Sequence, residues 1–145
     1  MKVLVSACLL GAACRYDGQN KAYPLVDKLC RCHQVVPVCP EQLGGLPTPR
    51  TPSERRGEQV VTKEGVDVTA QYRRGAEEAV RLAKLLGCTV AVLKERSPSC
   101  GSGEIYDGTF TGMLTDGYGV AAETLRNAGI RVIGESQLAQ FLSES

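Results

Sequence analysis

Short apolar runs alternate along this chain with segments whose apolar residues recur at helical spacing. The helical pattern is strongest over residues 69–86, and Gly87 ends that segment. Further helices are predicted over residues 23–32, 119–128 and 136–142. Strands rich in Val, Leu and Ile are predicted over residues 2–7, 34–38, 88–94 and 130–133. Strands that alternate with helices predict an α/β fold class: a compact three-layer domain with a short, mainly parallel sheet of about four strands and helices on both faces.

Two segments interrupt this alternation. Residues 44–69 are rich in proline, glycine and arginine, and only residues 59–61 look like a strand, so we expect a long functional loop or a small hairpin flap. Residues 102–112 form a second loop, in which a small hairpin around residues 106–108 would fit. Three arginines of the first segment could bind a phosphate or simply keep the loop soluble: Arg50, Arg55 and Arg56.

Size and charge limit the classes of function. With 145 residues we expect one domain, residues 1–145, which can bury a core without cross-links. The net charge of +1, from 17 basic and 16 acidic residues, indicates neither a nucleic-acid nor a membrane partner. No apolar run is as long as a membrane-spanning helix, and the apolar N-terminus is too brief for a signal peptide. We therefore expect a cytoplasmic protein, either a monomer or a weak homodimer.

The seven cysteines add the most information. An odd number in a reducing compartment disfavours structural disulfides. Cys88 opens an apolar strand, where a small buried hydrophobe is expected. Cys8, Cys39 and Cys100 each follow the carboxyl end of a different predicted strand, which is where open parallel sheets bind ligands. We therefore expect these three thiols to meet at one rim of the sheet.

Three thiolates at one rim suit a metal centre. They can hold zinc or three irons of a [4Fe–4S] cluster, because soft thiolate ligands suit both. A site with three protein ligands leaves one metal position open for a substrate, as catalysis requires. Cys14 could supply a fourth thiolate from its loop. On the residues alone, zinc and the cluster both stay open.

Polar residues beside these cysteines suit proton transfer. Glu41 follows Cys39 by two residues, and a carboxylate next to a metal centre can move protons, although a solvated or helix-capping glutamate would look the same. Ser97 and Ser99 precede Cys100, and their hydroxyls could bind a cluster or a substrate, or only form the turn.

Three other functions fit parts of the sequence. A zinc-binding, non-catalytic module could use Cys30, Cys32 and His33 with one further cysteine. A sulfur-relay or redox protein could exchange disulfides or persulfides through Cys8 with Cys14 or Cys39, and would need a thiol of low pKa. An accessory domain could bind a nucleotide through its glycine loops. Because the chain has a single histidine, no Ser–His or Cys–His catalytic pair is convincing.

At these loops the sequence resembles the thiouracil desulfidase family. The resemblance rests on several motifs spread over nearly the whole chain: SACLLG (6–11), CRYDG (14–18), PVCPE (37–41), LGGL (43–46), PR (49–50), SPSCG (97–101) and YDGTF (106–110). Each motif is weak alone, and together they are specific.

This resemblance implies a compact α/β domain that carries a [4Fe–4S] cluster on Cys8, Cys39 and Cys100. It implies that the open iron acts as a Lewis acid on the sulfur of a thiolated nucleobase such as 2-thiouracil, a small heterocycle, with release of uracil and sulfide. The matching acid/base residue is Glu41. The matching serine is Ser97 or Ser99, and we favour Ser97 because Ser99 adjoins a ligand.

Overall fold

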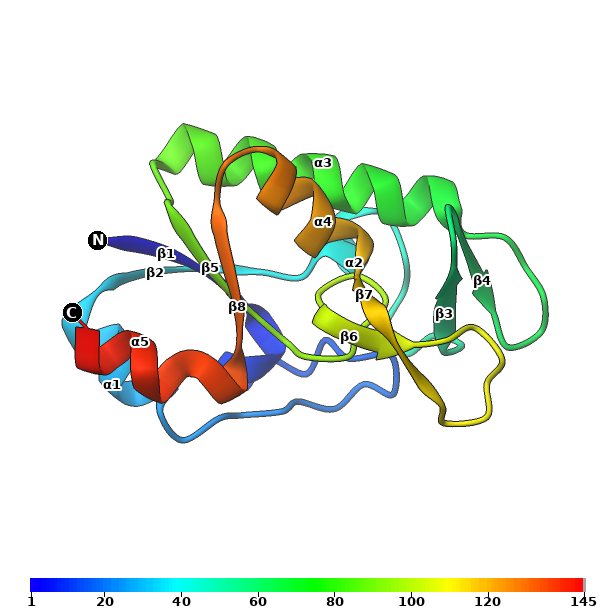
Figure 1. The fold of residues 1–145 in the computed structure, drawn as a ribbon, viewed down its shortest axis with the longest axis horizontal. Coiled ribbons are helices and arrows are strands. Elements are labelled where there is room, and N and C mark those ends of the chain that lie inside the picture. Colours follow the sequence, from blue (N-terminus) through cyan, green and yellow to red (C-terminus); the bar gives the residue numbers. More distant parts are fainter. Residues whose placement is uncertain (145) are drawn as a thin grey trace.

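A computed structural model describes residues 1–144 and shows a four-stranded parallel sheet at the centre of the molecule (Figure 1). The strands follow the order β2-β1-β5-β8 across the sheet. Their bounds are Lys2–Ser6 for β1, Gln34–Val38 for β2, Val90–Leu93 for β5 and Arg131–Gly134 for β8. The α/β fold class predicted from the sequence is thus confirmed.

Helices cover both faces of this sheet. Alternate residues of β1 point to opposite faces, as strand geometry requires. Val3 and Val5 pack on the face covered by α1 (Val26–Cys32) and α5 (Leu138–Glu144). Leu4 packs on the other face, under α3 (Thr69–Leu86) and α4 (Val120–Asn127). The two layers of core confirm the predicted three-layer arrangement.

The strand order reverses beside β1. Val3 of β1 pairs in parallel with Val35 of β2 on one side and with Val90 of β5 on the other. The chain therefore moves from β1 to one neighbour first and later crosses to the opposite side. The loops that leave β1 and β5 diverge at this point, and they open a crevice beyond the carboxyl ends of the strands.

Two antiparallel hairpins extend beyond that end of the sheet, away from the two termini (Figure 1). One consists of β3 (Ser53–Arg56) and β4 (Gln59–Thr62), and the other of β6 (Ser102–Tyr106) and β7 (Leu114–Tyr118). The Glu54 carboxylate joins them by accepting hydrogen bonds from the backbone N–H groups of Gly108 and Phe110, at 2.9 and 3.1 Å. The sequence indicated a strand only at residues 59–61 of the first hairpin.

Three short helices complete the fold. Helix α2 (Pro40–Leu43) follows β2 directly, and single 3-10 turns η1 (Ala7–Leu10) and η2 (Glu135–Gln137) follow β1 and β8. Within residues 1–144, no helix combines the length and the apolar character needed to cross a membrane.

Candidate active site

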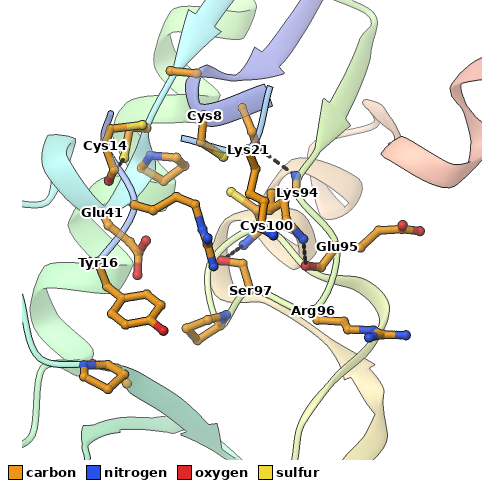
Figure 2. Close-up of a pocket in the computed structure, with 18 of the residues that line it drawn as sticks. Cys8, Cys14, Tyr16, Lys21, Glu41, Lys94, Glu95, Arg96, Ser97 and Cys100 are labelled. Atoms are coloured by element: carbon orange, nitrogen blue, oxygen red, sulfur yellow. Dashed lines mark hydrogen bonds between the residues drawn. The ribbon is translucent and has the colours of Figure 1, made fainter. Parts of the chain in front are cut away.

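A pocket of about 460 Å³ lies in the crevice at the carboxyl ends of β1, β2 and β5. Four cysteines line it, although they are far apart in the sequence: Cys8, Cys14, Cys39 and Cys100. Figure 2 shows Cys8, Cys14 and Cys100 with Glu41, Lys94 and Ser97 around this space. The structure thus brings together all the candidate ligands that the sequence suggested for one rim, and Cys14 as well.

Local structure places each of the three candidate ligands. Cys8 lies in η1, two residues after β1, and is 7% exposed. Cys39 stands between β2 and α2, where Pro40 begins the helix. Cys100 lies in the loop after β5 and is 6% exposed. Cys8 and Cys39 thus lie within two residues of a strand end. Cys100 follows β5 by seven residues, and its backbone N–H is held by Ser97 Oγ at 3.0 Å.

Burial favours the neutral form of three of the pocket thiols, those of Cys8, Cys14 and Cys100. Desolvation raises the pKa of Cys8 from 9.0 to about 11, although the positive charges of Lys94 and Arg15 oppose the shift. Desolvation and the neighbouring Cys39 raise the pKa of Cys14 to about 12. Burial also raises the pKa of Cys100 far above its usual range. A bound cation would favour the thiolates, so several buried thiols in one pocket fit a thiolate-bound metal cluster.

The spacing of these thiols differs from a site for a single ion. No three His, Cys, Asp or Glu side chains among the described residues 1–144 are arranged to hold one metal ion. In a cluster each cysteine binds its own iron, so the sulfur atoms need not converge on one point as they must around zinc. The pocket cysteines therefore offer the thiolate ligands that an iron–sulfur cluster needs.

Glu41 lies in α2 and points its carboxylate into the pocket (Figure 2). Arg50 donates to Oε2 through Nη2 at 2.8 Å, and the Tyr72 hydroxyl donates to Oε1. Tyr72 comes from α3 and is 2% exposed. The sequence gave Arg50 only a phosphate-binding or solubility role. It gave no sign of Tyr72, which looks like a core residue of an amphipathic helix.

The structure separates the two candidate serines. Ser97 lines the pocket, and its Oγ accepts hydrogen bonds from the backbone N–H groups of Ser99 and Cys100 at 3.1 and 3.0 Å. Because its oxygen is engaged as an acceptor, its O–H is free to donate into the pocket. Ser99 is buried outside the pocket lining, and its Oγ has no partner among the residues that the structure describes.

A second set of contacts ties the strand ends together around the cysteines. The backbone N–H of Lys94 donates to Ser6 Oγ at 2.9 Å, which links the end of β5 to the end of β1. The Ser6 side chain also hydrogen-bonds Cys100. Lys94 Nζ lies 3.2 Å from Glu135 Oε2, so its positive charge is held beside the pocket rather than in solvent.

The residues of the zinc alternative lie elsewhere. Cys30, Cys32 and His33 surround a shallow depression together with Met1 and Lys2, at the amino ends of β1 and β2. Both Cys30 and Cys32 are exposed. The pocket cysteines lie at the carboxyl ends of the strands, so none of them is beside this group to complete a zinc site.

The loop with glycines that could bind a nucleotide is Gly117-Tyr118-Gly119, and its Gly119 has a packing role. Gly119 lies so close to the loop before Cys100 that a Cβ on it would stand 2.4 Å from the Ser99 carbonyl carbon. Its lack of a side chain lets the start of α4 pack against the loop that carries Ser97 and Cys100. This close approach accounts for the glycine without a ligand.

Comparison with known proteins agrees with this geometry. The model of a family described as 2-thiouracil desulfurase matches residues 3–137. An uncharacterized protein of Bacillus subtilis (strain 168), YbbK, is 44% identical over 150 residues, which cover 97% of this chain and 99% of YbbK. A solved structure of TudS, a [4Fe-4S]-dependent thiouracil desulfidase, is 50% identical and superposes with a TM-score of 0.92 over 99% of both chains.

Proposed function

Because this chain belongs to the 2-thiouracil desulfurase family, we propose that it is a [4Fe–4S]-dependent desulfidase that removes sulfur from a thiolated nucleobase such as 2-thiouracil. One observation in the structure carries the proposal: Cys8, Cys39 and Cys100 line one pocket together with Glu41 and Ser97. We also propose that residues 1–145 form a single iron–sulfur-binding domain.

The three cysteines are the proposed holders of the cluster. They come from the segments that follow β1, β2 and β5, and their thiols, of which those of Cys8 and Cys100 are buried, would lose protons on binding iron. When bound, the cluster supplies an open iron that acts as a Lewis acid on the exocyclic sulfur of the substrate. The remaining steps belong to side chains of this chain.

Glu41 is the proposed acid/base residue. Its carboxylate lies in the pocket and takes a proton from the water that attacks the carbon bearing sulfur. It then returns a proton to the departing sulfur. Water thus supplies the oxygen of uracil and the hydrogens of hydrogen sulfide, and no electrons are exchanged with a second cofactor. The reaction is a hydrolysis of a C–S bond.

Ser97 is the proposed hydrogen-bond donor to the heterocycle. Two backbone N–H groups fix its oxygen, which aims its hydroxyl hydrogen away from the loop. A donor placed in this way stabilises negative charge that develops on the ring as water attacks. Ser99, buried outside the pocket lining, has no comparable access to a substrate.

The sulfur-relay alternative has less support. A thiol that attacks disulfides or accepts persulfide sulfur needs substantial thiolate at neutral pH. Burial instead raises the pKa of Cys8 to about 11 and that of Cys14 to about 12. These thiols suit metal ligation better than nucleophilic attack.

The proposal is tested with protein purified and assayed without oxygen. We expect a brown protein with about equal iron and acid-labile sulfide, as [4Fe–4S] requires. It should convert 2-thiouracil into uracil and sulfide in equal amounts. The Glu41→Ala variant should keep the iron and sulfide content and lose turnover. A colourless protein that holds one zinc ion without labile sulfide, and that yields no uracil after reconstitution, would overturn the proposal.

A further inference from the structure

We propose that Arg50 and Tyr72 are positioning residues that clamp the Glu41 carboxylate in the orientation needed for proton transfer in the pocket. The inference rests on the proposed function, because it assigns these two residues a role through Glu41. Neither side chain belongs to the lining of the pocket, so neither is proposed to touch the substrate.

Glu41 needs such support because its own element is short. Helix α2 has four residues, Pro40–Leu43, and Glu41 stands in its first turn at the edge of the pocket. This side chain has three rotatable bonds and is 17% exposed. A carboxylate that is free to rotate would spend much of its time away from the water that it must deprotonate.

Arg50 holds one carboxylate oxygen from the proline-rich loop. Its side chain is 5% exposed and donates to Glu41 Oε2 at 2.8 Å. The same guanidinium donates to the carbonyl oxygens of Cys14 and Pro47, at 3.0 and 3.1 Å, and to Thr48 Oγ1 at 2.9 Å. These hydrogen bonds fix the orientation of the guanidinium plane, so the Arg50 group that faces Glu41 stays in place.

Tyr72 holds the other oxygen from the opposite side. Its ring is packed in a small core with Val60 and Val68, and its hydroxyl donates to Glu41 Oε1. The Ser53 side chain, at the start of β3, hydrogen-bonds this hydroxyl in turn. Burial and the adjacent carboxylate raise the pKa of Tyr72 far above its usual range, so the hydroxyl stays a donor.

Two partners on two oxygens determine the plane of the carboxylate. With only one partner, the carboxylate could still rotate about its hydrogen bond to that partner. With both, the lone pairs that Arg50 and Tyr72 do not use are the ones left for the pocket. Three elements meet at the Glu41 carboxylate: α2, the loop that precedes β3, and α3. The clamp therefore also joins the wall of the pocket to α3, which covers the sheet.

Two single substitutions test the clamp in the cluster-loaded enzyme. Tyr72→Phe removes only the hydroxyl, and Arg50→Lys keeps the charge but loses the planar fork. A hydrogen bond to a charged group corresponds to a roughly ten- to hundred-fold effect, so we expect each variant to lower kcat by about that factor with little change in KM. Because Glu41→Ala should lose turnover, the coupling of each residue to Glu41 is measured by stability instead of by kcat. Tyr23→Phe and Arg131→Lys, outside the pocket, are the matched controls.

Urea unfolding of the cluster-free proteins gives a readout that needs no activity. Tyr72→Phe should lower the folding equilibrium constant clearly when Glu41 is present and much less when it is alanine. Equal losses of the folding equilibrium constant with and without Glu41 would show that Tyr72 has a merely structural role, and would overturn the inference. A wild-type kcat in both Tyr72→Phe and Arg50→Lys would also overturn the inference. An active Glu41→Ala enzyme would instead overturn the role of Glu41 in the proposed function.

Discussion

Gly75 of α3 lies directly against the carbonyl group of Pro40 at the start of α2. A Cβ on Gly75 would stand 1.8 Å from the Pro40 carbonyl oxygen, and a Cβ on Gly44 would stand 1.9 Å from the Gln71 carbonyl oxygen. The two glycines therefore let the helix that carries Glu41 touch the helix that carries Tyr72. Without this close approach the carboxylate and the hydroxyl could not meet.

Gly75→Ala should accordingly disturb both stability and catalysis. Alanine in mid-helix would favour α3 by about 1 kcal/mol, but the clash is with backbone and forces α2 to move, at a cost of about 1–3 kcal/mol. We expect a lower free energy of unfolding in urea. We also expect a lower kcat, because the movement carries Glu41 away from Tyr72.

Gly87→Ala is the control for this prediction. Gly87 ends the same helix at φ 74°, and a Cβ there meets no atom within 4 Å. Alanine should cost about 1 kcal/mol of backbone strain and leave kcat unchanged. If Gly75→Ala kept wild-type kcat and stability, contact between α2 and α3 would not position Glu41.

The pattern of apolar residues in each segment decided how well that helix or strand could be predicted from the sequence. Helix α3 occupies residues 69–86, as its apolar spacing and Gly87 indicate. Strand β3 could not be predicted, because its sequence Ser-Glu-Arg-Arg has no apolar alternation. Strand β3 pairs with the adjacent β4, but its side chains bind residues far along the chain: Glu54 accepts from the backbone N–H of Gly108, and Arg55 lies 2.6 Å from the carboxylate of Glu123. No local pattern of apolar residues shows these long-range contacts, which help to hold the strand in place.

The residues of the site also differ in how far the sequence could predict them. Cys8, Cys39 and Cys100 could be brought together from sequence because strand ends of a parallel sheet share one rim. Tyr72 could not, because its ring packs as an ordinary core side chain and only its hydroxyl reaches Glu41. For the two serines the sequence favoured Ser97, because Ser99 adjoins a candidate ligand. In the structure Ser97 lines the pocket and Ser99 lies outside its lining.

The proposed ligands can be checked one at a time. Cys8→Ala, Cys39→Ala and Cys100→Ala should each lower the iron and sulfide retained after anaerobic reconstitution, and each should weaken the cluster absorbance. Cys88→Ala is the matched control, because Cys88 is also buried but does not belong to the lining of the pocket. Full four-iron absorbance in any one of the three variants removes that residue from the ligand set.

The reactivity of the thiols should follow their burial in the cluster-free protein. Cys30 and Cys32 are exposed and should react first with iodoacetamide at pH 8. Because the pKa of Cys8 is raised from 9.0 to about 11, its thiolate fraction should grow about tenfold for each pH unit up to that value. Peptide mass spectrometry at pH 8 and pH 10 measures both rates. Modification of Cys8 as early as Cys30 at pH 8 would contradict the raised pKa.

The Glu54 carboxylate should hold the second hairpin in place over the pocket. Glu54→Ala removes the acceptor for the N–H groups of Gly108 and Phe110, and these amides should then exchange faster with deuterium. Glu64→Ala, an exposed glutamate in the loop after β4, is the control. Unchanged exchange in the 107–113 loop would mean that other contacts, such as Arg56 Nε to the Gly108 carbonyl at 2.6 Å, suffice.

Ser6 should stabilise the frame of the site before any cluster is bound. Its Oγ accepts from the Lys94 N–H at 2.9 Å, and it is 2% exposed, so Ser6→Ala leaves that donor buried without its partner. Such a loss costs about 1–3 kcal/mol, and urea unfolding of the cluster-free protein measures it. Ser143→Ala, which removes an exposed hydroxyl bonded to the Gln140 carbonyl, should change the free energy of unfolding much less. Equal effects of the two substitutions would show that the link between β1 and β5 does not depend on this bond. A larger loss at Ser6 would show that the strand ends carrying Cys8 and Cys100 are joined before metal arrives.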